Sequence, residues 1–406
     1  MSKNDAPSSP HDPNRFALER RRFLSEGTTH GVGAAGILAG LGLSHYAVAQ
    51  IQGAPGAAGA PNNATGTAAP AGAPPASGAG APAMRPPLPP EPKVSQAAPL
   101  NNLKGKVAYI TASSDGIGLG IARAASNAGM KVCIGYRNED RLKAALPLFK
   151  KGNAGILPIK HDVTDRDAWA RVLEQIKSEF GKLHLVVNNA GLKTRAKLTE
   201  VSATEWDNAV AVNYTATYNS VAVLLPHMLE HGEGSHIVVT SSMSGLLPGS
   251  NLGVYTATKI AAAGLIEALR VELEGTTVGT SAFVPGGVNT DNYIGTGEEN
   301  PYRAANPPPA GVPRRAGPPA GMDPLEAGER VLNGVIHNDL FIVTHPEYMP
   351  GTKQRFDAML ISEPQEDTPP PEARVKGETR VLHAGIYPRE IVHRKKKRKS
   401  FRSVTV

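Results

Sequence analysis

The feature that most constrains this fold is a regular alternation of short apolar runs with helical segments, which begins at Leu103. The runs are apolar throughout instead of alternating with polar residues, as expected for strands covered on both faces. The alternation therefore predicts an α/β fold, a doubly wound parallel sheet in a three-layer α/β/α arrangement. The expected strands are Lys106–Ile110, Lys131–Gly135, Gly155–Pro158, Leu183–Asn188, His236–Thr240, Thr280–Val284 and Leu340–Val343, and the expected helices include Ile121–Ala128, Glu139–Phe149, Asp167–Phe180, Ala203–Leu229 and Gly253–Leu273.

The 406 residues are expected to hold one catalytic domain, because the 43 glycines and 35 prolines are distributed too unevenly for two or three domains. The domain is placed at residues 101–362, with a Pro/Gly-rich insertion or lid at 296–322. Residues 50–100 are rich in Ala, Pro and Gly and cannot bury enough apolar surface to offset ordering entropy, which predicts a disordered linker. Residues 363–406 are Pro-rich and then basic, and are expected to form a disordered tail.

Residues 1–49 have the pattern of an export signal. A polar region ends in a twin arginine at Arg20 and Arg21, a weakly apolar Gly/Ala-rich stretch follows at Gly31–Leu43, and Ala47-Val48-Ala49 supplies a small-x-small cleavage pattern. These features predict a twin-arginine signal peptide and a periplasmic or secreted protein. An uncleaved membrane anchor and a plain N-terminal tail are the alternatives.

The net charge and the cysteine and histidine content of the chain limit the kinds of partner and ligand that it is expected to bind. The net charge of +7 comes largely from the run Arg394–Lys399, which predicts a solvated tail with at most weak contact to anionic surfaces. Few aromatic residues accompany the run, so nucleic acid is not expected. The single cysteine, Cys133, excludes an intramolecular disulfide, and the histidines His161, His227 and His345 are too widely spaced for a metal site.

A polar, glycine-containing turn joins the first expected strand to the first expected helix. Backbone amides and a helix N-terminus at such a place can hold a pyrophosphate, and glycines permit its close approach. We therefore expect this turn to bind a dinucleotide cofactor. The residues expected to bind it are Thr111, Ser113, Ser114, Asp115, Gly116, Ile117 and Gly118.

The end of the second strand bears on the choice of cofactor. Tyr136 stands where an acidic residue would bind a ribose 2′-hydroxyl, and Arg137 follows it, which suits a 2′-phosphate. NADP is therefore favoured over NAD. A small shift of the strand boundary would bring Glu139 or Asp140 near the ribose instead.

Three further segments lie at the ends of expected strands, where open α/β sheets bind ligands. Each could be an ordinary cap or turn when taken alone. In the last of them, Thr290 could bind the carboxamide of the cofactor. The residues concerned are Asp162 and Val163 after the third strand, Asn189, Ala190 and Gly191 after the fourth, and Pro285, Gly286, Val288 and Thr290 after the sixth.

The candidate catalytic residues follow the fifth strand. Tyr255 and Lys259 are four residues apart, so on a helix their side chains emerge on one face, and an ammonium beside a phenol favours the phenolate. Any helix surface can carry a tyrosine and a lysine at this spacing, so the other motifs in the sequence decide whether the pair is catalytic. Asn213 lies within an expected helix, where asparagine is mildly unfavourable and calls for another reason.

Taken together, these motifs resemble the classical branch of the short-chain dehydrogenase/reductase family, over about Leu103–Thr290. The resemblance implies a Rossmann-type fold in which Ser242 polarises a substrate carbonyl, chosen over Ser241 and Ser244 by its distance from the tyrosine. It also implies that Tyr255 donates or removes the proton. Lys259 would bind the nicotinamide ribose and lower the pKa of the tyrosine, and Asn213 would hold a water of the proton relay.

The expected function is hydride transfer between a nicotinamide cofactor and a carbonyl or secondary alcohol. The alternative is a non-catalytic dinucleotide-binding sensor or scaffold. The resemblance further implies a homo-oligomer, dimer or tetramer. The sequence departs from the family at Ala112, where the family has glycine, which is acceptable only if this position does not need a positive φ. It also departs in the Pro-rich segment after Thr290.

Overall fold

The computed structural model describes residues 97–149, 155–290, 321–363, 371–376 and 385–395. The expected signal peptide, nearly all of the expected linker, most of the 296–322 insertion and the basic residues beyond 395 lie outside these ranges. Within them, no helix is long and apolar enough to cross a membrane.

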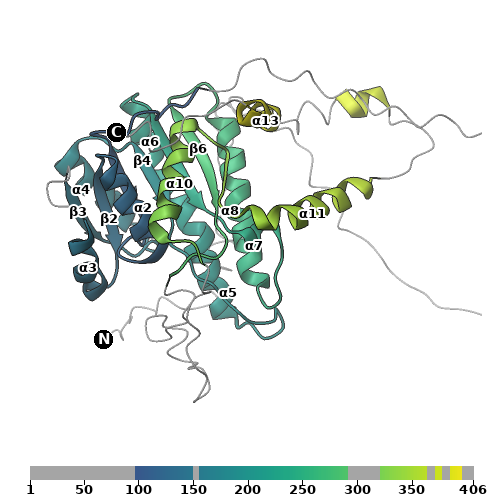
Figure 1. Ribbon diagram of the computed structural model, residues 1–406, viewed down its shortest axis with the longest axis horizontal. Helices are drawn as coiled ribbons and strands as arrows, with labels where there is room; N and C mark the ends of the chain where they lie inside the picture. The colour runs from purple at the N-terminus through teal and green to yellow at the C-terminus, as the bar shows by residue number, and fades with distance from the viewer. Residues whose placement is uncertain (1–96, 150–154, 291–320, 364–370, 377–384, 396–406) are drawn as a thin grey trace, which may run out of the picture. The chain divides into compact units, whose positions relative to one another are not determined.

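The described residues form a seven-stranded sheet in the order β3-β2-β1-β4-β5-β6-β7, in which all neighbouring strands are parallel (Figure 1). The sequence order reverses between β1 and β4, which makes the carboxyl edge of these two strands the place where such sheets bind ligands. The expected α/β sheet is confirmed. The strands are β1 Val107–Ile110, β2 Lys131–Tyr136, β3 Ile156–Lys160, β4 Leu185–Asn188, β5 Ser235–Thr240, β6 Val278–Val284 and β7 Phe341–Val343.

Helices cover both faces of the sheet. The helices among the described residues include α2 Gly116–Asn127, α3 Glu139–Ala145, α4 Ala168–Phe180, α5 Ala203–Val210, α6 Ala216–Glu230, α7 Met243–Leu246, α8 Gly253–Glu272, α10 Pro324–His337, α11 Met349–Ile361 and α13 Ile386–Lys395, with a π-helical turn η3 at Ala211–Thr215 and 3-10 turns η2 at Leu146–Leu148 and η4 at Pro346–Tyr348. Helices α2 and α10 lie side by side on one face (Figure 1), whereas α4, α6 and α8 pack on the other.

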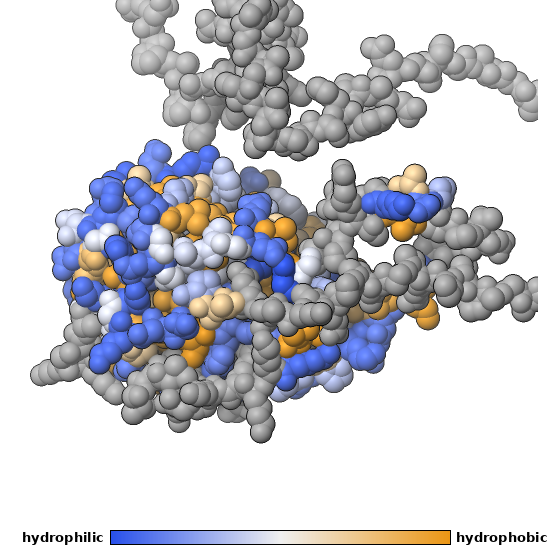
Figure 2. All heavy atoms as spheres, turned by 90° about the horizontal axis from the view of Figure 1, so that it is seen from above, coloured by the Kyte–Doolittle hydropathy of each residue, from blue (hydrophilic) through white to orange (hydrophobic). Residues whose placement is uncertain are grey.

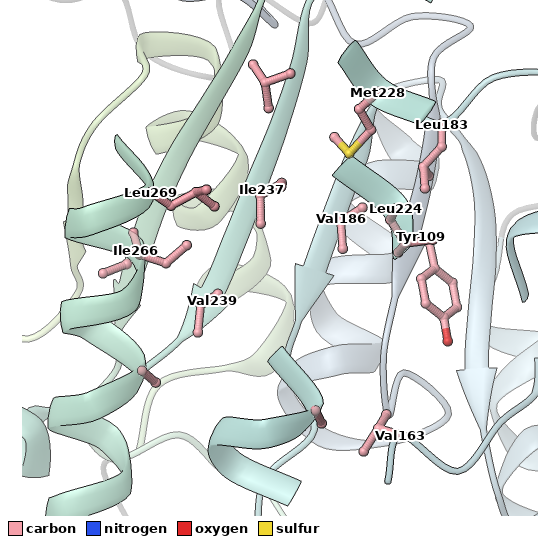
Figure 3. Packing of buried hydrophobic residues seen from close by; sticks show 14 of the residues in the cluster. Tyr109, Val163, Leu183, Val186, Leu224, Met228, Ile237, Val239, Ile266 and Leu269 are labelled. Carbon is pink, nitrogen blue, oxygen red and sulfur yellow. The ribbon is translucent and has the colours of Figure 1, made fainter. Parts of the chain in front are cut away.

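Each face of the sheet has its own hydrophobic core, which explains the uniformly apolar strands. In β1, Val107 and Tyr109 point into the core under α4, α6 and α8, whereas Ala108 and Ile110 point into the core under α2 and α10. Figure 3 shows the first of these cores, with Tyr109 among the labelled side chains. Side chains alternate between faces along a strand, so a strand buried on both sides needs apolar residues at every position.

The structure differs from the sequence-based expectation in two places. The single helix expected at Ala203–Leu229 is α5, the π-helical turn η3 and α6. The tail expected to be disordered contains α13, whose Ile386 is buried against the core that also contains Leu269 of α8. The sequence did not indicate this helix, because its charged residues are typical of a solvated tail. In the structure these charges have partners on the domain, since Arg389 pairs with Glu274 and Arg394 pairs with Asp339.

The surface has the character expected of a folded domain. Figure 2 shows hydrophilic side chains over most of the face that it displays, with smaller hydrophobic areas between them. Such scattered apolar side chains are normal on a protein surface.

Candidate active site

The phosphate turn is held by close backbone packing between β1 and α2. Gly116 has φ of +53°, and a Cβ on Gly118 would lie 2.3 Å from the carbonyl oxygen of Ala112 and 2.7 Å from Nδ2 of Asn189. Only glycine fits at position 118. A turn with glycine at positions 116 and 118, at the start of a helix, leaves room for a pyrophosphate, so these residues fit a dinucleotide cofactor.

The departure at Ala112 is a strained one. Its φ is +50°, in the left-handed region that favours glycine, so the condition under which alanine would be acceptable here is not met. The exposed side chain of Ala112 avoids a clash but not the backbone strain.

Several side chains of the turn fix its shape. The Thr111 hydroxyl accepts hydrogen bonds from the backbone amides of Asn189 at 2.8 Å and Ala190 at 2.9 Å. Ser113 Oγ donates to the carbonyl oxygen of Ile110 at 2.7 Å and is fully buried. The hydroxyls of Thr111 and Ser113 therefore tie the turn to its own strand and to the loop after β4. Ser114 is also buried, Ile117 packs against the core under α2 and α10, and Asp115 forms an ion pair with Arg141.

The end of β2 carries an exposed arginine. Nη1 of Arg137 lies 3.4 Å from Oδ2 of Asp162, and 60% of the arginine side chain is accessible. Burial raises the pKa of Asp162, but hydrogen bonds from Thr164 and the charge of Arg137 outweigh it and hold that pKa below its usual value. Val163, next in the chain, is buried.

The acidic alternative at this place is already engaged. Oε1 of Glu139 accepts from Lys160 at 3.1 Å and from the hydroxyl of Tyr136 at 3.3 Å. Asp140 lies next to Lys143 at 3.5 Å on the exposed surface of α3. At the end of β2 the structure therefore places an arginine with 60% of its side chain accessible close to carboxylates that are paired with lysines.

The expected catalytic pair, Tyr255 and Lys259, lies on α8. The Lys259 side chain is buried, its Nζ donates to the carbonyl oxygen of Thr240 at 2.8 Å, and Nζ lies 5.6 Å from the ring centroid of Tyr255. Burial lowers the pKa of Lys259 to about 8. The ammonium is thus still charged at neutral pH, beside the tyrosine ring.

Asn213 occupies the π-helical turn that the sequence pattern had shown as plain helix. Its Oδ1 accepts from the amide of Leu192 at 2.7 Å, and its Nδ2 donates to the carbonyl oxygen of Leu192 and to the hydroxyl of Thr258, both at 2.9 Å. A π-helical turn inside a helix is a frequent mark of a functional site. Here it places asparagine between the loop after β4 and the helix of the catalytic pair.

Gly191 lies beside both Asn213 and Lys259. A Cβ at this glycine would lie 3.3 Å from Nζ of Lys259 and 3.5 Å from Oδ1 of Asn213. The Asn189–Gly191 loop, η3 and α8 therefore converge on one place at the carboxyl edge of the sheet.

The two neighbouring serines have different environments. Ser241 Oγ donates to the carbonyl oxygen of Lys259 at 2.7 Å, which anchors the start of α8 to the end of β5. Ser242 is the N-cap of α7, and its Oγ accepts from the amide of Ser244 at 3.1 Å. The hydroxyl proton of Ser242 is not used in that bond, which leaves it able to donate to a carbonyl oxygen.

The loop after β6 is supported by His345, one of the three histidines that are too widely spaced in the sequence for a metal site. The amide of Gly286 donates to Nδ1 of His345 at 2.9 Å, and Nε2 of His345 contacts the carbonyl oxygen of Gly287 at 3.0 Å. Pro285 and Val288 are buried, and the Thr290 side chain lies beside Gly116 of the phosphate turn, 3.3 Å from where a Cβ would be. No sequence signal marks His345, because the contact joins segments nearly sixty residues apart.

A parallel sheet with a glycine-bearing turn at its switch point and a tyrosine–lysine pair at the same edge defines a nicotinamide-dependent oxidoreductase. Residues 106–300 match the family model described as short chain dehydrogenase. An uncharacterized oxidoreductase of Staphylococcus epidermidis is 33% identical over 206 residues, which cover 50% of this chain and 88% of the relative. The chain belongs to the short-chain dehydrogenase/reductase family.

Two further relatives agree with this assignment. A C alpha-dehydrogenase of Sphingobium sp. strain SYK-6 is 26% identical over 288 residues, covering 69% of this chain and 93% of the relative. The crystal structure of a short chain dehydrogenase/reductase from Burkholderia phymatum in complex with NAD is 26% identical, with a TM-score of 0.60, and covers 66% of this chain and 99% of that one. The expected enzyme class, an NAD(P)-dependent dehydrogenase/reductase acting on small molecules, is confirmed.

Proposed function

We propose that this enzyme uses NADP and transfers hydride between the nicotinamide and a carbonyl or secondary alcohol, with Tyr255 as general acid/base. When bound, the nicotinamide supplies or accepts the hydride. The dinucleotide would be held by the turn Ser113–Gly118, by Arg137 and Asp162, and by the Asn189–Gly191 and Pro285–Thr290 loops.

The side chains near Tyr255 have separate roles in the proposed reaction. Ser242 donates a hydrogen bond to the substrate oxygen, and Tyr255 gives that oxygen its proton in reduction or removes the proton in oxidation. The ammonium of Lys259 stabilises the phenolate that is left after proton donation. The hydrogen bonds of Asn213 to Leu192 and Thr258 tie the loop after β4 to α8, and Asn213 would hold a relay water.

The observation that carries this proposal is the buried ammonium of Lys259, 5.6 Å from the ring of Tyr255. Burying a cation costs free energy, and the cost is smaller when a neighbouring group becomes anionic and pairs with the cation. A lysine on an ordinary helix surface would instead extend into water.

The test is turnover of a panel of ketones and alcohols by purified protein and by its Tyr255→Phe variant. We expect the variant to lose about 10²-fold or more of kcat, the size of a general acid/base contribution, while cofactor affinity changes little. Tyr218→Phe is the matched control, because Tyr218 is an exposed tyrosine of α6. Equal turnover in wild type and Tyr255→Phe would refute the assignment.

The preference for NADP is supported by the accessible charge of Arg137 and by the engagement of Glu139 with Lys160. Arginine pairs well with a phosphate monoester, whereas a paired carboxylate is less available to a ribose hydroxyl.

We also propose that the chain is exported by the twin-arginine route and is a homo-oligomer. Export is supported by Arg20-Arg21 and the Ala47-Val48-Ala49 pattern, and Lys replacements of both arginines should retain the protein in the cytoplasm. A cytoplasmic fraction no larger than that of wild type would contradict this.

Oligomer formation is supported by exposed aromatic side chains of α5 and α6, Trp206 and Tyr218, and sedimentation velocity measures it.

A further inference from the structure

The ring of His345 holds two consecutive residues of the Pro285–Thr290 loop at once. Its Nδ1 accepts from the backbone amide of Gly286 at 2.9 Å, and its Nε2 lies 3.0 Å from the carbonyl oxygen of Gly287. An amide N–H only donates and a carbonyl oxygen only accepts, so these partners assign a neutral ring that carries its proton on Nε2.

The contact between the ring and Gly286 is close as well as hydrogen-bonded. A Cβ on Gly286 would lie 2.5 Å from Cγ and 2.9 Å from Nδ1 of His345, and the histidine is buried. A larger residue at position 286 would therefore push the ring away. The place of the loop and the place of the ring depend on each other.

The ring is itself fixed by regular structure. His345 lies two residues after β7 and directly before the 3-10 turn η4. The carbonyl oxygen of the preceding residue, Thr344, accepts from Nη1 of Arg330 on α10 at 2.8 Å, and the Thr344 hydroxyl lies 2.8 Å from Nδ1 of the histidine. Strand β7 and helix α10 thus position the ring, and the ring positions the loop.

The loop reaches from the phosphate turn to the expected catalytic serine. At its start, the carbonyl oxygen of Pro285 accepts from the amide of Met243 at 2.9 Å, and Met243 directly follows Ser242. At its end, the side chain of Thr290 lies 3.3 Å from where a Cβ on Gly116 would be. A dinucleotide whose pyrophosphate lies at the turn would extend along this loop toward the serine.

We propose that His345 is a positioning residue for the nicotinamide end of the cofactor, acting through the amide of Gly286. The inference rests on the proposed function in one respect, that the Pro285–Thr290 loop binds the nicotinamide end. Loss of the ring frees a loop that is also bonded to the residue after Ser242. A shift of about 1 Å in a reacting group can cost about 10²-fold in rate, so both binding of the nicotinamide end and hydride transfer should depend on His345.

The test compares a whole cofactor with the half that lacks nicotinamide. The full-length protein and its variants are titrated by calorimetry with NADP⁺ and with 2′,5′-ADP, and then with NAD⁺ and ADP, so that the result does not depend on cofactor preference. His345→Leu leaves the Gly286 amide without its acceptor and should weaken the whole dinucleotide by about tenfold, the effect of one unsatisfied amide. The half cofactor should change about twofold at most.

Two conservative variants separate the hydrogen bond from the packing of the ring. His345→Asn places an amide oxygen near the position of Nδ1 and should retain affinity for the whole dinucleotide within about threefold of wild type. His345→Gln extends its amide toward the position of Nε2 instead and should lose about as much affinity as His345→Leu. With a ketone that the enzyme reduces and saturating NADPH, kcat should fall about tenfold or more in the leucine variant and be largely restored in the asparagine variant.

The matched control is His184→Leu, at the amino edge of the sheet. Nδ1 of His184 accepts from the amide of Val107 at 3.2 Å, and its Nε2 lies 2.9 Å from the carboxylate of Glu233. This variant loses the same kind of bond away from the site, so it should leave every affinity unchanged even where it lowers the melting temperature.

Four results overturn the inference. They are unchanged affinity for the whole dinucleotide in His345→Leu, an equal loss of whole and half cofactor in that variant, an asparagine variant that binds no better than the glutamine variant, and a loss in His184→Leu equal to that in His345→Leu.

Failure of this inference and failure of the proposed function are distinguishable. Turnover that persists in Tyr255→Phe removes the general acid/base role and leaves the comparison of whole and half cofactor as it stands. Unchanged cofactor affinity in His345→Leu, with turnover still dependent on Tyr255, removes only the role of His345.

Discussion

The ammonium of Lys259 is hydrogen-bonded to the carbonyl oxygen of Thr240, 2.8 Å away, at the carboxyl end of β5. The sheet therefore positions the cation on α8 directly, without an intervening carboxylate. A backbone carbonyl carries only a partial negative charge and does not neutralise the ammonium. Burial therefore disfavours the charged form, and the pKa of Lys259 falls to about 8.

The first prediction concerns pH. Below pH 8 Lys259 is charged and, in the proposed mechanism, supports the phenolate of Tyr255. Above pH 8 the charge is lost, so kcat/KM should fall as the pH rises through about 8. Lys259→Arg keeps a cation at all these pH values and should move the alkaline limb upward, at some cost in rate because the longer side chain fits poorly. The pH profiles of the two proteins check this, and an unchanged alkaline limb in the arginine variant would contradict it.

The same depressed pKa has a stability consequence. Between pH 8 and the unfolded pKa of 10.5, the unfolded chain binds more protons at this lysine than the folded chain does. The contribution of Lys259 to the free energy of unfolding therefore rises with pH in that window. Denaturation of wild type and Lys259→Met at pH 7 and pH 10 should show the difference shifting in favour of wild type at the higher pH.

The second prediction concerns the strained turn. Ala112→Gly should raise the free energy of unfolding by about 1 kcal/mol, because glycine adopts φ of +50° without the backbone strain that alanine has there. Urea denaturation measures the change. The matched control is Ala170→Gly, an exposed alanine inside α4, where glycine should cost about 1 kcal/mol. A loss of stability at both positions would show that Ala112 is not strained.

The third prediction concerns the close contact of α2 with the turn. Gly118→Ala places a Cβ 2.3 Å from the carbonyl oxygen of Ala112, so the turn must shift and dinucleotide affinity should fall by about tenfold or more. Fluorescence titration with NADPH measures it. Gly264→Ala in α8, where the added Cβ meets nothing within 4 Å, should leave affinity unchanged and raise stability by up to about 1 kcal/mol. Unchanged NADPH affinity in Gly118→Ala would argue against cofactor binding at this turn.

The fourth prediction concerns the cofactor preference. Arg137→Ala should weaken NADPH by about tenfold or more, since it removes a charge-assisted contact, and should leave NADH almost unaffected. Arg171→Ala is the control, because Arg171 is equally exposed and pairs with Asp165 away from the cofactor turn. Tighter binding of NADH than NADPH by the wild-type protein would reverse the assignment of Arg137.

The fifth prediction concerns α13. A chain ended after residue 384 loses the buried Ile386 and leaves Asp339, 3% exposed, without Arg394 and His393, and should lose about 3 kcal/mol or more of stability. A chain ended after residue 395 keeps these contacts and should melt like the full-length protein. Equal melting temperatures for the two truncations would show that α13 does not stabilise the domain.

The strands and the motif order could be read from the sequence because each depends on local composition. A strand buried on both faces must be apolar at every position, and β1 to β7 fall within a few residues of their expected bounds. The convergence of Gly191, Asn213 and Lys259 also follows, since the carboxyl ends of parallel strands share one edge.

What the sequence could not show depends on contacts between distant segments. The π-helical turn at Asn213 is set by its bonds to Leu192 and Thr258, not by helix propensity. The φ of Ala112 belongs to the path of the turn beside Gly118, so the sequence could give the strain at this residue only as a condition. Helix α13 was missed because its charged residues signal solvent until their partners on the domain are known.

Helix α13 also changes what the outer edge of the sheet can do. Strand β7 is the last in the sheet, and such a strand offers unpaired amides and carbonyls to any extended chain. Here Glu390 accepts from the amide of Leu340 at 3.1 Å, and Arg394 donates to the carbonyl oxygen of Phe341. Two side chains of one helix thus bind backbone groups of Leu340, just before β7, and of Phe341 in β7. Because β7 is synthesised before α13, we expect this edge to be open to pairing with other nascent chains until α13 has docked.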